Sequence, residues 1–563
     1  MMNGAFFMSV LAVLGGLAAF LFVGWGAARR IQRGCALPGA FALPLVWLVN
    51  SVVGYAVFFA FVSGPVWGFA SAGVLLGGLV IWTFASLVRE KQLRHFWLLR
   101  RTASLVVVLA MAAVFYTANL WSAAKNERFV QVPEGRYLDA KLPGDNVIPY
   151  WVAHYVLDGR WGEELFATDN LAGWLLSDRP PLQAGVYLAY LGPSKLLGLP
   201  TSVTYQSLGM VLQLGWITGF LVLAGRTVGP RWAGPALALL VGTGMAVTNM
   251  AYVWPKLICA GFVALSIALM LRPRGRGEEG RLVLAALAFA LALLSHGGAL
   301  FSAPAFGLVF LARWRRRLPV GIALGILAAL CVLGPWSAFQ KTVAPPGNNL
   351  LKWHLAGQFA PDDRSLGEAL KAGYGSITLE EALKARWHNA TIILGFHKDH
   401  RLDFEAGIVN SLRRMQWYLV IPSAGVLLLG LVGWCTVFRR KPQAMALWKR
   451  AGFLGVVSIL SWMFWVALLF QGGEAFMHHG SYGTMLLWYL FLVAGIFAAG
   501  ERFTTFLIVL QSAAFLCFWS LPFGTVVMEE GGSWLMLPWV IAVGTYLWLM
   551  WRLWWSVKRS VSR

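Results

Sequence analysis

Charged side chains are scarce in this chain. Only 12% of its 563 residues are Asp, Glu, Lys or Arg, whereas 58% are hydrophobic and the mean hydropathy is +0.66. A soluble domain carries roughly 25% charged residues, and long apolar runs of the kind found here belong in a bilayer. The composition therefore excludes a soluble globular protein and predicts an all-α polytopic membrane protein.

Acidic residues are the scarcer of the two charged classes. The chain has 24 acids against 46 Lys and Arg, which gives a formal net charge of +22. The basic residues occur as short clusters between apolar runs, and the positive-inside rule produces this distribution in membrane proteins. We therefore assign the basic charge to membrane topology and expect no nucleic acid as a partner.

Cysteines and nucleotide-binding motifs are also few. The cysteines lie far apart in or beside apolar runs, without metal-ligand spacing, so we expect small buried residues at Cys35, Cys259, Cys331, Cys435 and Cys517. The sequence has no Gly-x-x-x-x-Gly-Lys-Ser/Thr motif and no Gly-x-Gly-x-x-Gly following a strand, so neither ATP nor a dinucleotide is implied. The predicted cytoplasmic loops are too short for a nucleotide-sugar domain, which favours a lipid-linked donor.

The apolar runs are separated by basic clusters that can all be cytoplasmic if the N-terminus lies outside. Residues 1–26 lack a basic n-region, which indicates a span rather than a signal peptide. Spans are predicted at 5–26, 41–63, 67–88, 102–122, 203–225, 232–252, 256–271, 282–296, 298–312, 318–338, 416–438, 452–470, 482–499, 504–522 and 534–551.

This topology divides the chain into four regions. Residues 1–101 form extra N-terminal spans, and residues 102–338 form a core that includes a first external loop at 123–180. Residues 339–415 form a second external loop, in which Thr378 and Glu381 have capping-box spacing and predict a helix start. Residues 416–563 form the C-terminal spans.

One apolar segment, residues 181–199, does not fit the alternation. Counting it as a full span would move every later basic cluster to the outside. We interpret it as re-entrant or interfacial, and such backbone is tolerated at membrane depth only where protein covers it or a wet cavity lies beside it. The segment therefore indicates a functional site next to the first external loop.

Several motifs stand in a fixed order from Asp145 onward. They are Asp145-Asn146, the amphipathic stretch 153–161, Asp178-Arg179-Pro180-Pro181-Leu182, the stretch 248–257 with Trp254-Pro255-Lys256, and the stretch 294–304 with His296. In letters and spacing they resemble the membrane glycosyltransferases of the GT-C fold, in particular the aminoarabinose transferase and protein O-mannosyltransferase group. The resemblance covers roughly residues 102–340 and implies a helical bundle that transfers a sugar from a polyprenyl-phosphate donor.

The chain also departs from that family. The family often has two adjacent acids where this chain has Asp145-Asn146, so a divalent metal is possible but not implied, and no cofactor is expected. It usually has an Asp where this chain has Lys256 and a Lys where this chain has His296. Its spans before the loop are fewer, and no large soluble C-terminal domain follows here, so the external loops must recognise the acceptor.

A transferase of this class needs a base for the acceptor hydroxyl and positive charge for the phosphate. We assign Asp145 as general base, because a carboxylate at the mouth of an apolar cavity is partly desolvated; the alternative is an N-cap of a helix beginning near Val147. We assign Arg179 as the phosphate clamp, since a guanidinium holds two oxygens in a fork. Its alternative is an interfacial Arg that extends to headgroups.

Other polar residues of the core are candidate ligand contacts. Lys256 is a second phosphate contact or a headgroup anchor. His296, between two short helices, is favoured as a helix-packing residue over a catalyst. Asp178 and His154 are further candidates for donor or acceptor contact.

The later external loops add candidates. Lys352 and His354 lie beside a Trp and suit an anionic, sugar-bearing acceptor. Glu474 is either a second acid near the donor or a solvated charge. His397, Asp399 and His400 have ligand chemistry for Zn²⁺ without diagnostic spacing, so no metal site is predicted.

The sequence therefore predicts a transferase of the bacterial inner (cytoplasmic) membrane whose active site faces the periplasm. Its partners are a polyprenyl-phosphate (undecaprenyl-phosphate) sugar donor, a lipid or glycan acceptor of the cell envelope such as lipopolysaccharide, and membrane lipids. One rival is a glycan polymerase or ligase with a diphosphate-linked donor. The other is a lipid-glycan transporter, which paired repeats and a charged path at mid-membrane would favour, and the sequence shows neither.

Overall fold

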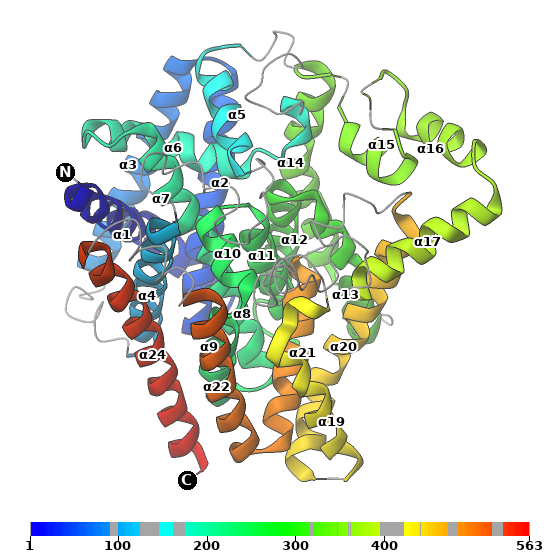
Figure 1. Ribbon diagram of the computed structural model, residues 1–563. Helices are drawn as coiled ribbons and strands as arrows, with labels where there is room; N and C mark the ends of the chain where they lie inside the picture. Colours follow the sequence, from blue (N-terminus) through cyan, green and yellow to red (C-terminus); the bar gives the residue numbers. More distant parts are fainter. Residues whose placement is uncertain are drawn as a thin grey trace.

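The computed structural model describes residues 2–89, 100–123, 146–160, 175–314, 319–345, 347–358, 360, 362–394, 421–439, 441–470, 482–520 and 533–561. Within these ranges the regular elements are helices and no strand occurs (Figure 1). The prediction of an all-α, multi-pass membrane protein is confirmed. Eight helices in these ranges are long and apolar enough to cross a membrane: Met8–Gly34, Gly39–Val62, Pro65–Arg89, Thr201–Thr227, Gly297–Trp314, Val320–Thr342, Pro442–Leu468 and Glu501–Phe518.

The N-terminal helices follow the predicted spans. They are α1 (Met2–Gly34), α2 (Ala42–Val62), α3 (Pro65–Arg89) and α4 (Arg100–Ala123). Helix α2 packs against α1, α3 and α6 (Leu182–Leu196). Gly54 of α2 lies so close to Gly185 of α6 that a Cβ on Gly185 would overlap the Gly54 carbonyl oxygen. Small residues of this kind let membrane helices approach at backbone contact.

Helix α6 occupies the segment that does not fit the alternation of spans. It follows the short helices α5 (Ile148–Leu157) and η5 (Leu176–Asp178). With 15 residues it is about 22 Å long, less than the roughly 30 Å of a bilayer core. Its residues from Leu182 to Leu191 are all buried. A re-entrant or interfacial position for this segment stays a prediction.

The central helices surround α11 (Lys256–Met270), which packs on α8 (Gly215–Thr227), α12 (Glu278–Ser295) and α21 (Tyr482–Ala499). The expected continuous span at 232–252 is wrong, because it is two helices, α9 (Pro230–Val241) and α10 (Gly244–Tyr252). Thr243 is the N-cap of α10, and its hydroxyl accepts a hydrogen bond from the Ala246 amide at 3.4 Å. The other central helices are α7 (Thr201–Gln213), η6 (Gly297–Ser302), α13 (Ala303–Trp314) and α14 (Val320–Thr342).

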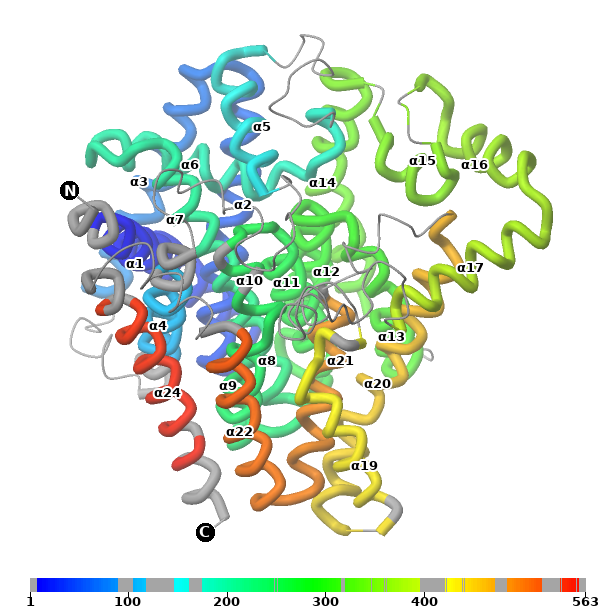
Figure 2. The backbone as a smooth tube through the Cα atoms, viewed as in Figure 1, coloured from blue at the N-terminus to red at the C-terminus, as the bar shows by residue number. Residues whose placement is uncertain are grey.

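The second predicted external loop contains α15 (Asn349–Ala356), α16 (Leu366–Gly375) and α17 (Leu379–Leu394), which lie to one side of the bundle (Figures 1 and 2). The predicted capping box is confirmed. The Thr378 amide donates to the Glu381 carboxylate at 2.8 Å, and the Glu381 amide donates to the Thr378 hydroxyl at 3.2 Å.

The C-terminal helices overlap the last predicted spans within the described residues, although the span expected at 416–438 contains a 3-10 helix with non-helical backbone at Gly425. They are η8 (Pro422–Leu429), α19 (Gly430–Phe438), α20 (Pro442–Leu468), α21, α22 (Glu501–Phe515), the π-helical turn η10 (Leu516–Ser520) and α24 (Ser533–Val561). Gly430 and Gly495 bring α19 and α21 together, since a Cβ on either would overlap backbone of the other helix. Helix α20 closes one side of the cavity described next.

Candidate functional site

A cavity of about 330 Å³ lies where several of the sequence motifs converge. Its wall is made by η5 and the residues after it, the link between α10 and α11, the junction of α12 with η6, and parts of α14, α15 and α20. Three of these contributions are motifs that the sequence singled out, at 177–180, 254–255 and 295–298. The fourth, at 348–355, comes from the second external loop.

Arg179 enters this wall directly after η5. Its backbone is extended, with φ −112° and ψ 120°, because the residue before a proline avoids the helical region. The carbonyl of Ser177 accepts a hydrogen bond from Gln340 of α14 at 2.9 Å, which ties the short helix to the bundle. The backbone of Arg179 is therefore restricted by the proline that follows it, and the short helix before it is anchored to the bundle.

Asp178 is the acid that the described residues contribute to the cavity. Its side chain is 5% exposed, and Oδ2 accepts hydrogen bonds from the Leu175 amide at 3.0 Å and from Asn349 Nδ2 at 3.5 Å. Burial raises the pKa of Asp178, while the Leu175 and Asn349 hydrogen bonds and the charge of Arg179 act in the opposite direction. Burial in this largely apolar site therefore makes the ionised form of Asp178 energetically unfavourable.

Lys256 opens α11 beside the cavity. It is 1% exposed, and its ammonium lies 3.1 Å from the ring centroid of Trp254, a wall residue. This is a cation–π contact in a desolvated place, where such contacts are strongest. The ring of Trp254 thus separates the Lys256 ammonium from the cavity, and the ammonium makes the electrostatic potential in the cavity more positive.

The turn before Lys256 is strained. Val253 has φ +51° and ψ 31°, a left-handed conformation that β-branched residues rarely adopt. Its carbonyl accepts a hydrogen bond from Gln183 Nε2 at 2.9 Å, and Gln213 donates to Gln183 Oε1 at 3.1 Å. Gln213 also accepts from the Ile258 amide at 3.0 Å. The sequence analysis did not select Gln183 and Gln213. A glutamine inside an otherwise apolar helix is the sequence feature that would have pointed to them.

His296 caps α12 with an extended backbone, φ −158°, and lines the cavity. Its Nδ1 accepts a hydrogen bond from the Gly298 amide at 3.0 Å, so the neutral ring carries its proton on Nε2. This contact agrees with a packing role. The charges of Lys256 and Arg179 act on His296, which places both cations near this ring.

His354 of α15 reaches the same cavity. Its ring stacks on that of Trp353, with 4.7 Å between centroids. Burial first, and then the charges of Arg179 and Lys256, lower the pKa of His354 to about 4. The imidazole is therefore neutral at pH 7, and the cavity keeps its hydrogen-bonding capacity without a third positive charge.

Much of the remaining wall is aromatic. Trp254, Trp336, Trp353 and Trp465 line the cavity together with Phe301. Flat rings beside a few convergent polar groups are typical of sites for small ligands with an apolar part. No pattern along the chain singles out Trp336, Gln340 or Trp465, because sequence does not show which face of a long helix turns toward a distant loop.

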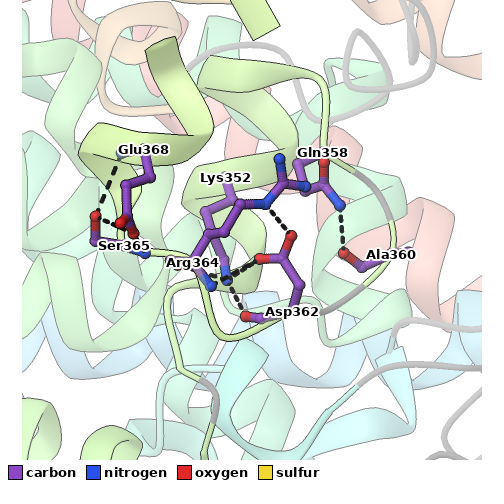
Figure 3. A network of polar contacts seen from close by, with 7 residues as sticks. All are labelled: Lys352, Gln358, Ala360, Asp362, Arg364, Ser365 and Glu368. Atoms are coloured by element: carbon purple, nitrogen blue, oxygen red, sulfur yellow. Dashed lines mark hydrogen bonds and ion pairs between the residues drawn. The ribbon is translucent and has the colours of Figure 1, made fainter. Parts of the chain in front are cut away.

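Two candidates lie apart from the cavity wall. His154 packs among aromatic rings, 4.3 Å from the Tyr150 centroid and 6.2 Å from that of Tyr187. Lys352 is 1% exposed and forms an ion pair with Asp362 at 3.0 Å; it also donates to the backbone carbonyls of Asp362 and Arg364 (Figure 3). It therefore holds the chain after α15 in place, and ligand contact stays a prediction for both residues.

Several predictions fall outside the described residues. These are Asp145, Glu474, and the trio His397, Asp399 and His400. Pro149, four positions after Asp145, lines the cavity. Helix α5 begins at Ile148, and its N-cap residue, Val147, makes no side-chain capping hydrogen bond. Within the described part of the chain, no three His, Cys, Asp or Glu side chains are grouped to hold a metal ion.

Comparisons of the chain with known protein families, with curated proteins and with solved structures gave no match. Functional conclusions about this chain therefore rest on the cavity and on the motifs that line it.

Proposed function

We propose that this protein is a GT-C-like membrane glycosyltransferase that takes a sugar from a polyprenyl-phosphate donor to a lipid or glycan acceptor facing the periplasm. The observation that carries the proposal is the convergence of Arg179, Trp254 and His296, far apart in the sequence, on one cavity. The half-buried Arg179 and the buried Lys256, beside aromatic walls, suit a ligand that joins an anionic phosphate to a sugar and an apolar chain.

In the proposed reaction, Asp145 accepts the proton of the acceptor hydroxyl as its oxygen bonds to C1 of the sugar. The bond between C1 and the phosphate oxygen breaks, and its electron pair stays on the departing polyprenyl phosphate. Arg179 holds that phosphate in a fork, and Lys256 adds positive potential through the wall at Trp254. His354 and His296 are neutral and add no charge, so the positive charges of Arg179 and Lys256 act on the phosphate.

The test is a transfer assay with purified protein, a radiolabelled polyprenyl-phosphate sugar and a membrane-lipid acceptor. We expect Arg179→Gln to lower transfer by at least about tenfold, the scale of one lost charge-assisted contact, and Asp145→Asn to abolish it. The matched control is Arg160→Gln, an exposed arginine beside Tyr155 that does not line the cavity.

Two outcomes would contradict the proposal. Full transfer by Asp145→Asn would remove the base assignment. Transfer by wild type only from a diphosphate-linked donor, and from no monophosphate donor, would favour the polymerase or ligase class.

A further inference from the structure

A second set of cations lies at the opposite end of α11 from Lys256. Arg226 lies in the last turn of α8, and Arg272 follows α11. Arg281 lies in the first turn of α12, and Arg313 lies in the last turn of α13. Because α11 has 15 residues, this arginine cluster is about 22 Å from the cavity end of the helix. It is a separate place in the fold.

The guanidinium groups converge on the carbonyls of one short link. Arg226 donates to the Leu271 carbonyl at 3.3 Å, and Arg313 donates to the same carbonyl at 3.4 Å and to that of Arg272 at 2.6 Å. Arg281 donates to the carbonyls of residues 273 and 276, each at 2.8 Å. Four positive side chains are therefore gathered around residues 271–276.

Within the described residues, acids offset this charge only in part, because the charge of Glu278 acts on Arg313 but the arginines outnumber the nearby acids. The acids beside the cluster are Glu278 and Glu279, and their carboxylates accept hydrogen bonds from Trp314 Nε1 at 3.1 Å and from the Gly321 amide, respectively. The ion pairs of the described chain lie elsewhere, in α15 to α17. Burial and then the charges of Arg226 and Arg281 lower the pKa of Arg272, which confirms that the cations are close.

The cluster also has unused donors. The Nε atoms of Arg226, Arg272 and Arg313 are buried and have no hydrogen-bond partner in the part of the chain that the structure describes. Buried donors are nearly always paired. An oxyanion between the guanidinium groups would accept these hydrogen bonds and offset the repulsion among the positive charges.

The position of the cluster identifies the source of that oxyanion. The candidate spans Thr201–Thr227 and Gly297–Trp314 both end at these arginines, so the cluster lies where a membrane helix meets lipid headgroups. Basic pockets between helix ends at that level suit phosphate-bearing headgroups. We propose that the arginine cluster binds the phosphate of an anionic membrane lipid, in the leaflet opposite the cavity. This site is independent of the transferase activity.

The test measures lipid binding to the full-length protein in detergent by native mass spectrometry and by thermal unfolding. The probes are phosphatidylglycerol, phosphatidylcholine and inorganic phosphate. We expect Arg226→Gln combined with Arg313→Gln to lower the affinity for phosphatidylglycerol by about 30-fold, from the attraction of two surface cations. Arg450→Gln, an exposed arginine of α20, is the control and is expected to bind as wild type does.

The outcomes separate the sources of phosphate. Stabilisation by phosphatidylglycerol, with little effect of the other two probes, supports the proposal. Equal stabilisation by inorganic phosphate would contradict a lipid, and wild-type affinity in the double Gln variant would contradict the site. If that variant does not fold, the double variant Arg226→Lys and Arg313→Lys is used instead. It keeps both positive charges but loses the paired N–H donors of the guanidinium groups. Undiminished affinity in it would equally overturn the assignment.

Discussion

At the scale of single residues, burial and neighbouring charges shift the pKa values of the cavity side chains. Burial raises the pKa of Asp178 and lowers that of His354, so both side chains are displaced toward their neutral forms. The charge of Arg179 acts on both groups. Perturbed groups of this kind gather at functional sites, because chemistry needs charge where burial disfavours it.

Asp178→Asn tests whether that charge is costly. The folded-state pKa of Asp178 lies above 3.8, so its favourable contribution to stability is present at low pH and is lost as the pH rises through the folded-state value. At pH 7.5 we expect the variant to raise the free energy of unfolding by about 1 kcal/mol. Chemical denaturation across pH 3.5–7.5 checks this, and the gain should disappear at the acidic end.

The exposed acid Asp363 supplies the control, since Asp363→Asn should leave stability unchanged at both pH values. A loss of stability in Asp178→Asn at neutral pH would mean that its hydrogen bonds to Leu175 and Asn349 outweigh the cost of burial.

At the scale of elements, the cavity depends on how the second external loop is fastened. Asp362 bridges buried Lys352 and Arg364, at 3.0 and 2.5 Å (Figure 3). Partial burial alone would raise the pKa of Asp362, but the hydrogen bonds from these two cations hold it below its usual value. The chain after α15 is thereby fixed, and with it the cavity residues His354 and Asn349.

Asp362→Asn should loosen this attachment, because it leaves the Lys352 ammonium buried without a counter-charge. We expect a loss of about 1–3 kcal/mol in stability and faster hydrogen exchange over residues 352–365. The matched change Glu380→Gln breaks an exposed pair with Lys384 on α17, and it should produce no measurable effect. Equal exchange rates in the two variants would show that the loop is held by packing alone.

Helix α8 packs closely on α11 at Gly261, within the helix. A Cβ on Gly219 would overlap the carbonyl oxygen of Gly261, whereas Gly225, on the same helix, has no atom within 4 Å of such a Cβ. We expect Gly219→Ala to destabilise the protein by about 1–3 kcal/mol, the range for an overpacked core, and Gly225→Ala to have no such cost. Thermal unfolding in detergent measures the difference, and equal melting temperatures would contradict the close approach.

Sequence patterns predicted the helices well and the cavity in part. Apolar run length located α2, α3 and α14, and motif order located Arg179, Trp254 and His296, which share one wall. The break at Thr243 was missed although Thr243 stands between two glycines, because the apolar runs on either side together have the length of one span. Trp336 and the Gln183–Gln213 contact were missed because they depend on which helix faces meet, and periodicity does not specify partners.

At the scale of the whole molecule, α11 connects two sites with different roles. The proposed donor cavity is at its N-terminal end beside Lys256, and the arginine cluster is at its C-terminal end around residues 271–276.

The central claim is that the cavity receives the phosphate of a polyprenyl-phosphate donor. The most direct measurement is cross-linking with a polyprenyl phosphate that carries a photoreactive group beside the phosphate, followed by peptide mapping. We expect labels at 177–180, 293–301 and 348–355, competition by unlabelled donor, and loss of labelling in Arg179→Gln but not in Arg160→Gln. Labelling spread over lipid-facing helices and indifferent to Arg179→Gln would contradict the account.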